Sequence, residues 1–167
     1  MAPSGRSSRL PRMSRTKQVL VAFLAGLLLF GIAATASARG LTSSETTLLQ
    51  AMNGVRAAHG LAPLCVDYRL ERTARIHSAD MLRRQYFAHG AFASRVRSSG
   101  APGPVFGENL AWGPASASWV VSRWLASPEH RSILLRPGFR RVGIGALQGT
   151  FAGRAGALIV TADFAGR

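Results

Sequence analysis

Cysteine is almost absent from this 167-residue chain, and its scarcity excludes two kinds of structure. Cys65 is the only cysteine, so neither an intrachain disulfide nor a thiolate metal cluster can form. Its neighbours Leu64 and Val66 are apolar, which predicts a buried structural thiol, and no motif of a thiol enzyme surrounds it. Stability must therefore come from a packed core, and any chemistry from other residues.

Acidic residues are also few, with seven Asp and Glu against 21 Lys and Arg. From residue 39 onward all sixteen cations are arginine, which leaves a formal charge of +9. The arginines are scattered along predicted helices without a run or interleaved aromatics, which argues against a specific nucleic-acid surface. We expect weak attraction to anionic envelope polymers or lipid headgroups, although compositional bias alone explains such a surface equally well.

Long apolar runs are limited to residues 19 to 34. Five cations precede this run and three small residues follow it: Arg6, Arg9, Arg12, Arg15 and Lys17, then Ala36, Ser37 and Ala38. This order predicts an export signal over residues 1 to 38, cleaved after Ala38. The alternative is a retained membrane anchor, because about 16 apolar residues can cross a thin bilayer. No twin-Arg pair precedes the run, so general export is favoured.

The pattern of the remaining residues, 39 to 167, predicts one α+β domain. Helical periodicity extends from a capping box at Thr42 and Glu45 to Gly60, and from an Asp67 cap to about Tyr86. Shorter helices are expected over residues 116 to 126 and 128 to 135, and residues 87 to 106 are expected to be a loop. Alternating residues from 141 to 164, with a turn over 149 to 156, predict two antiparallel strands. Helices packed on a small antiparallel sheet follow.

Four short motifs occur in order along this domain. They are NGVR at 53 to 56, YFAH at 86 to 89, GENLA at 107 to 111 and WLASPEHR at 124 to 131. Together they resemble the CAP superfamily, the SCP-like or cysteine-rich secretory protein domain, in its disulfide-free bacterial form. The resemblance extends from about Leu48 to Phe164 and includes the Gly143-Ile144-Gly145 of the penultimate strand.

The resemblance implies an α-β-α sandwich whose central cleft holds two histidines and two acids that can bind a divalent cation. By motif, His89, Glu108 and His130 match three members of this tetrad. The fourth, an acid three residues after the tryptophan, is replaced by Ser127. Glu129 is carried as a substitute, although it adjoins His130 and would point elsewhere in a helix.

Two interpretations of this cleft remain open. Two neutral imidazoles suit Zn²⁺, and Glu108 would supply the third ligand beside His89 and His130. Such a site should lose its ion below about pH 6, where the histidines protonate. The other interpretation is a hydrogen-bonded His/Glu network that pins the loop onto the helices.

Other conspicuous polar and aromatic residues have structural interpretations. His59 at a helix end and His77 within a helix belong to no motif, and Asn53 and Arg56 are expected to hydrogen-bond other elements. The three tryptophans, Trp112, Trp119 and Trp124, are expected in the core or the cleft wall. Gly143 and Gly145 indicate a tight strand crossing rather than a nucleotide loop.

We therefore expect a secreted monomer that binds a small lipid, a peptide or an envelope polymer without catalysis. No Gly-x-Ser-x-Gly motif occurs after residue 38. The alternative is a metal-assisted hydrolase in which Glu108 is the general base. A third hypothesis is an envelope-associated structural protein that is retained by its charge, which salt would weaken.

Overall fold

A computed structural model describes residues 40–167, so the predicted export signal and its cleavage site lie outside the described residues. The elements are α2 (Ser43–Ala58), β1 (Cys65–Val66), α3 (Tyr68–Arg84), α4 (Phe92–Ser98), β2 (Val105–Gly113), α5 (Ala117–Ala126), α6 (Pro128–Leu134), β3 (Phe139–Phe151) and β4 (Arg154–Gly166). Within residues 40–167, every helix is too short or too polar to traverse a bilayer.

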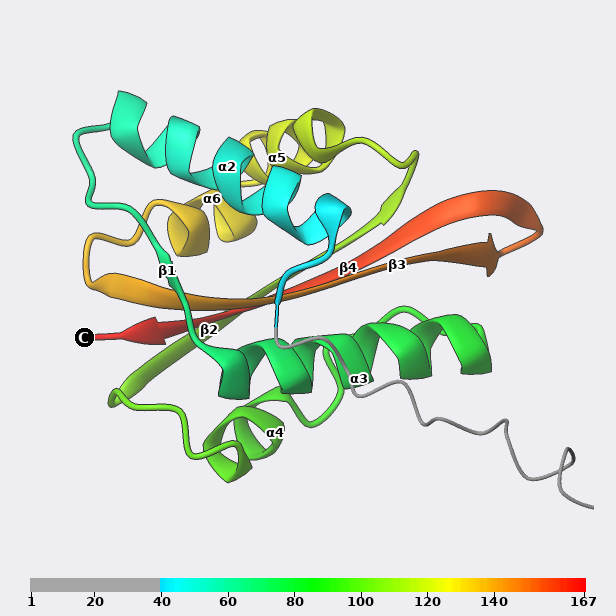
Figure 1. Cartoon of the computed structure of the whole chain (residues 1–167), viewed down its shortest axis with the longest axis horizontal. Coiled ribbons are helices and arrows are strands. Elements are labelled where there is room, and N and C mark those ends of the chain that lie inside the picture. The colour runs from blue at the N-terminus through cyan, green and yellow to red at the C-terminus, as the bar shows by residue number, and fades with distance from the viewer. Residues whose placement is uncertain (1–39) are drawn as a thin grey trace, which may run out of the picture. The chain divides into compact units, whose positions relative to one another are not determined.

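The expected α-β-α sandwich is confirmed. The sheet has the order β1-β3-β4-β2, and helices α2, α5 and α6 cover one face while α3 and α4 cover the other (Figure 1). The sheet is mixed rather than purely antiparallel, because β1 pairs with β3 in parallel. The long hairpin of β3 and β4 forms its centre, and β2 pairs with β4.

Three predicted boundaries were wrong. The expected loop over residues 87 to 106 contains helix α4, and the GENLA motif lies in strand β2. Strand β2 was not predicted because two polar residues, Glu108 and Asn109, interrupt the apolar pattern of its sequence. Both side chains are nevertheless buried between the helical layers. The hairpin turn is also shorter than expected, since Ala152 and Gly153 at φ 48° and 76° alone connect the two strands.

The helix starts follow the sequence signals. Thr42 N donates to Glu45 Oε2 at 2.8 Å, and Glu45 N donates to Thr42 Oγ1 at 3.3 Å, which completes the predicted capping box of α2. Asp67 caps α3 by accepting from Arg69 N at 3.0 Å. These caps satisfy backbone donors that have no partner within the helix.

Arg56 is fully buried and ties α2 to the segment between α6 and β3. Its guanidinium donates to four backbone carbonyls, those of Ala62, Leu134, Arg136 and Phe139, over 2.8 to 3.2 Å. Asn53 exchanges two hydrogen bonds with the backbone of Leu64. The structural role expected for both residues is confirmed, and Arg56 fixes the helix that carries His130.

Helix α3 lies directly against β3 where two glycines occur. A Cβ at Gly143 would lie 2.0 Å from the backbone of Leu70, and one at Gly145 would lie 2.4 Å from the backbone of Ala74. The expected tight crossing is therefore confirmed. It brings α3 close enough to the sheet for its side chains to reach the buried polar groups described below.

Cys65 is exposed, so the expectation of a buried thiol was wrong. Leu64 is buried and Cys65 points to the opposite side, as alternation along an extended segment requires. We expect a maleimide reagent to label Cys65 in the native protein about as fast as in the unfolded chain. Mass spectrometry after short exposure measures this, and labelling that requires denaturant would contradict the exposed position.

Candidate functional site

The four predicted cleft residues line one cavity of about 420 Å³. His89 follows α3, Glu108 lies in β2, and Glu129 and His130 lie in α6. The rest of the wall is largely apolar, with Phe92, Phe106, Gly107, Ile133 and Phe139, and also includes Ser132 and Arg136. Residues from three distant parts of the sequence thus meet in one partly apolar cleft.

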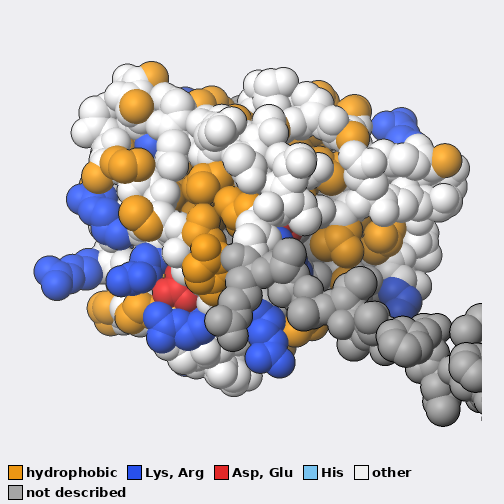
Figure 2. All heavy atoms as spheres, in the orientation of Figure 1, with side chains coloured by type: hydrophobic (Ala, Val, Ile, Leu, Met, Phe, Trp, Pro, Cys, Tyr) orange, Lys and Arg blue, Asp and Glu red, His pale blue; other side chains and the backbone are white. Residues whose placement is uncertain are grey.

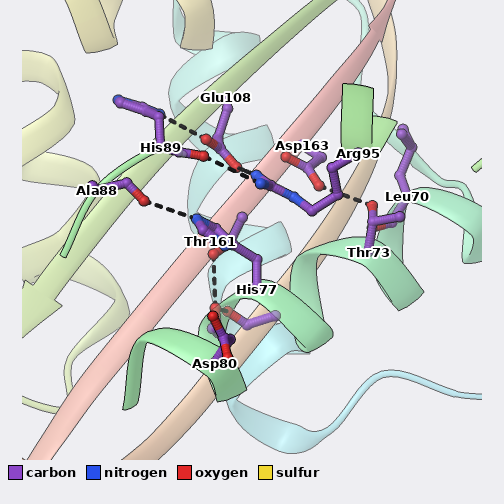
Figure 3. Close-up of polar contacts among 12 residues, drawn as sticks. Leu70, Thr73, His77, Asp80, Ala88, His89, Arg95, Glu108, Thr161 and Asp163 are labelled. Atoms are coloured by element: carbon purple, nitrogen blue, oxygen red, sulfur yellow. Dashed lines mark hydrogen bonds and ion pairs between the residues drawn. The ribbon is translucent and has the colours of Figure 1, made fainter. Parts of the chain in front are cut away.

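The carboxylate of Glu108 is buried and bonded at both oxygens. His89 Nδ1 lies 2.7 Å from Oε1, and Arg95 of α4 contacts Oε2 through Nη2 (Figure 3). Arg95 Nη1 also donates to the backbone oxygen of His89 at 3.2 Å. Because an ionised carboxylate only accepts hydrogen bonds, Nδ1 of His89 carries the hydrogen and its Nε2 is left as an acceptor.

Asp163 adds a second buried carboxyl group behind Glu108. The two residues are register partners in β4 and β2, and Oδ1 of Asp163 is buried without a hydrogen-bond partner within residues 40–167. Thr73 Oγ1 of α3 donates to Asp163 Oδ2 at 3.0 Å. Burial and the nearby Glu108 raise the pKa of Asp163 to about 8, so it holds a proton at neutral pH. Burial also raises the pKa of Glu108, and Arg95 opposes that rise by contacting its carboxylate.

Sequence reasoning missed both Arg95 and Asp163. Arg95 lay in the segment expected to be a loop. Asp163 is the only acid in the last strand, and it alternates with Ala162 and Phe164 that face the core. An acid within an otherwise apolar strand could have indicated a functional residue, because a charge that is buried in a sheet covered on both faces needs a partner.

His130 is oriented by Ser127, the residue that replaces the expected second acid. His130 Nδ1 lies 2.8 Å from Ser127 Oγ, and that oxygen also lies 3.0 Å from Glu129 Oε2. Asn109 Nδ2 of β2 donates to the His130 backbone oxygen at 2.9 Å and holds α6 against the sheet. Glu129 lines the cavity but is bonded to Ser127, so it does not take over the position of the missing acid.

Both cleft histidines are neutral near pH 7. Burial lowers the pKa of His89, and the adjacent Arg95 lowers it further. Burial and the nearby His89 likewise lower the pKa of His130. The two rings therefore present uncharged hydrogen-bonding edges to the cleft at neutral pH.

A zinc ion does not fit this arrangement. Both oxygens of Glu108 are occupied, one of them by a cation, so only Nε2 of each histidine stays open to an ion, which is one ligand fewer than catalytic zinc usually has. Within residues 40–167, no three His, Cys, Asp or Glu side chains converge as a ligand set. Zinc binding by His89, Glu108 and His130 stays an untested prediction that would require Arg95 to leave Glu108.

A second cavity of about 430 Å³ adjoins the first, and His130 lines both. Its wall is aromatic and includes Phe87 and all three tryptophans, Trp112, Trp119 and Trp124, beside Arg123. The predicted role of the tryptophans in the core or the cleft wall is confirmed, since Trp124 is also 1% exposed. Trp124 Nε1 donates to the backbone oxygen of Leu110 at 2.9 Å.

The remaining histidines have the structural roles expected. His77 is buried in α3, and its Nε2 lies 3.0 Å from the backbone oxygen of Ala88, which fixes the segment that leads to His89. His59 bonds the Val55 backbone oxygen at 2.9 Å at the end of α2. Neither residue lines the cleft cavity.

Comparison with known sequences decides the family. The model of the cysteine-rich secretory protein family, CAP, matches residues 49–164. The chain belongs to the CAP family. Among curated CAP relatives, the uncharacterized protein YkwD of Bacillus subtilis is 32% identical over 116 residues, covering 66% of this chain and 45% of the relative. The uncharacterized membrane protein YlbC of the same bacterium is 33% identical over 109 residues, covering 62% and 32%.

Solved structures agree on the CAP fold. An outer surface protein from Borrelia burgdorferi superposes with a TM-score of 0.65 at 22% identity, over 74% of this chain and 92% of that one. An extracellular protein containing an SCP domain from Bacillus anthracis gives 0.62 at 24% identity, over 77% and 45%. This CAP chain spans less than half of the length of both curated relatives.

Proposed function

We propose that this CAP protein is a secreted, non-enzymatic binding module for a small elongated ligand, a lipid or a peptide. The observation that carries the proposal is that His130 lines two adjoining cavities, one with a His/Glu edge and one with an aromatic wall. A ligand that crosses His130 would place an apolar part on the aromatic wall and a polar group at the histidines. Small-molecule sites commonly combine apolar walls with a few fixed polar groups.

Secretion is supported by the sequence signal and by the relatives. Residues 1 to 38 have the order of charges, apolar run and small residues of an export signal. The Bacillus anthracis relative is described as extracellular, the Borrelia relative as an outer surface protein, and one Bacillus subtilis relative as a membrane protein. A position outside the cytoplasm, free or attached to the envelope, fits all three.

The state of Glu108 favours binding over hydrolysis. A general base must accept a proton from an attacking water, but His89 and Arg95 already occupy both Glu108 oxygens. Burial raises the pKa of Glu108, and the adjacent guanidinium of Arg95 opposes that rise only in part. The buried Asp163 is protonated at neutral pH and offers no replacement.

Removing an aromatic side chain at the cavity rim tests the proposal. Phe87 is 40% exposed and lines the aromatic cavity, so Phe87→Ser should weaken binding about tenfold while the fold persists. Tyr68→Ser is the matched control, because Tyr68 is 61% exposed and lines neither cavity. Tryptophan fluorescence titrations of the full chain with dodecanoate and with a Phe/Ala hexapeptide give the affinities.

Glu108→Gln separates binding from the hydrolase alternative. The amide oxygen can still accept from His89 while the ion pair with Arg95 is lost, so we expect a less stable variant whose affinity stays within a few-fold of the wild type, a change on the scale of about 1 kcal/mol. Ester or peptide turnover by the wild type that Glu108→Gln abolishes would overturn the binding-only account. If Phe87→Ser and Tyr68→Ser weaken ligand binding equally, the aromatic cavity is not part of the binding site.

A further inference from the structure

A basic groove lies apart from the cleft, where β3 begins and β4 ends. It encloses about 600 Å³ and is lined by Arg140, Arg141 and Arg167 together with Gly103, Gly138 and Gly166. None of its lining residues is acidic, and none lines the two cavities around His130. The fold thus brings Arg167 beside the consecutive Arg140 and Arg141. Figure 2 shows basic side chains on the left, the side where Figure 1 places the C-terminus.

A β-bulge brings the two neighbouring arginines to the same groove. Successive residues of a regular strand point to opposite faces, so Arg140 and Arg141 would ordinarily diverge. The pairing of β3 with β4 steps from Phe139↔Gly166 to Arg141↔Ala165, which leaves Arg140 as the extra residue. Bulges re-aim side chains in this way, and here both arginines line the groove.

The charge of the groove is incompletely neutralised within the described residues. The Asp67 carboxylate is bonded to Arg69 at 3.1 and 2.9 Å and forms a longer ion pair with Arg141 at 3.5 Å, so one negative charge is shared by two guanidiniums. Arg140 Nη1 donates to the Pro137 backbone oxygen at 2.6 Å, which fixes its stem and leaves its other donors available. Arg140 and Arg141 are the two consecutive guanidiniums of the groove.

Besides its arginines, the groove is lined by glycines, two prolines and Ala165. A Cβ at Gly103 would lie 2.7 Å from the Gly166 backbone oxygen, so no side chain can fill this position without a shift. The large exposed hydrophobic residues of the described chain, Tyr68, Ile76 and Phe87, all lie elsewhere. A recessed groove whose charged side chains are arginines, and which has none of these large exposed hydrophobic residues, suits a flexible charged chain better than the surface of a membrane.

We propose that this groove binds the phosphodiester groups of an anionic polymer. Two guanidiniums from one strand can contact the two non-bridging oxygens of a phosphodiester through charge-assisted hydrogen bonds. A protein outside the cytoplasm that carries such a groove would be held on phosphate-rich polymer while its cleft stays free. The proposal does not depend on the ligand of the cleft.

The test measures binding of the full chain to a short poly(glycerol phosphate). The double variant Arg140→Gln/Arg141→Gln should bind at least about tenfold more weakly, because two charge-assisted contacts are lost. Arg84→Gln/Arg154→Gln is the matched control: it removes the same charge from the C-terminal end of α3 and the start of β4. We expect the control to bind within about twofold of the wild type, since distant exposed charges are screened.

Three outcomes would overturn the proposal. Equal losses in the groove and control variants would mean that net charge alone attracts the polymer. Equal affinity of the wild type for polyglutamate of matched length would remove the phosphate preference. Tighter binding to vesicles containing anionic lipid than to the polymer would identify a membrane surface as the partner. The dodecanoate affinity of the groove variant should stay unchanged, which separates this result from any failure of the cleft proposal.

Discussion

Arg95→Met is expected to lower the free energy of unfolding by about 3 kcal/mol at about pH 8, because it leaves a buried carboxylate without its cation. Arg95 contacts Glu108, and Glu108 shares its site with Asp163. The loss should be smaller at about pH 5. There the folded variant can protonate both carboxyl groups, so that no unpaired charge is buried.

The sign of this pH dependence follows from the raised pKa of Asp163. Its folded value of about 8 lies above its ordinary value of 3.8, so the folded state binds a proton that the unfolded chain releases. This contribution to stability is complete below about pH 4 and is lost as the pH rises towards 8. Without Arg95, the pKa of Glu108 in the folded state should rise further above its ordinary value. The free energy of unfolding of the variant should therefore fall more steeply as the pH rises.

Urea unfolding at the two pH values measures the effect. Arg97→Met is the matched control, because Arg97 lies on the same helix, is exposed and makes no ion pair within residues 40–167. We expect a change within about 0.5 kcal/mol for the control. A deficit for Arg95→Met that is equal at both pH values would show that Arg95 only fills space, and the charge argument would fail.

Gly143→Ala is expected to destabilise the fold by about 3 kcal/mol or more, because the added methyl group meets rigid backbone. Its Cβ would lie 2.0 Å from both the Leu70 carbonyl carbon and the Glu71 nitrogen. Neither atom can move aside without shifting α3 off the sheet. The same shift would pull Thr73 away from Asp163 and loosen the base of the cleft.

The control for this prediction is Gly54→Ala in the exposed part of α2. Nothing lies within 4 Å of the Cβ position at Gly54. Alanine should therefore stabilise the helix by about 0.5 to 1 kcal/mol. Thermal unfolding of both variants by circular dichroism gives the comparison. Equal stability of Gly143→Ala and the wild type would mean that α3 does not lie against β3 as described.

Sequence reasoning succeeded where a local signal matches a local structure. The capping box at Thr42, the cap at Asp67 and the serine before Pro128 each start a helix at the expected position. The motif residues His89, Glu108 and His130 were found because each lies in a short recognisable string, and the structure brings them together in one cleft.

Sequence reasoning failed where a residue depends on a distant partner. Strand β2 carries polar residues in its centre, and their partners, Arg95 and Asp163, come from elements 13 and 55 positions away along the chain. The exposed side of Cys65 likewise depends on the pairing of β1 with β3, which the apolar neighbours of the thiol do not reveal. The gathering of arginines at the basic groove required the bulge at Arg140.

The central claim is that a ligand covers His130 and extends into both cavities. Nuclear magnetic resonance tests it most directly, by following the side-chain signals of His89 and His130 and the indole N–H signals of Trp112 and Trp119 while dodecanoate or the hexapeptide is added at neutral pH. The account predicts that His130, His89 and at least one of these indoles shift together and saturate at one ligand concentration. A ligand that binds while the His130 signals stay unchanged would contradict it.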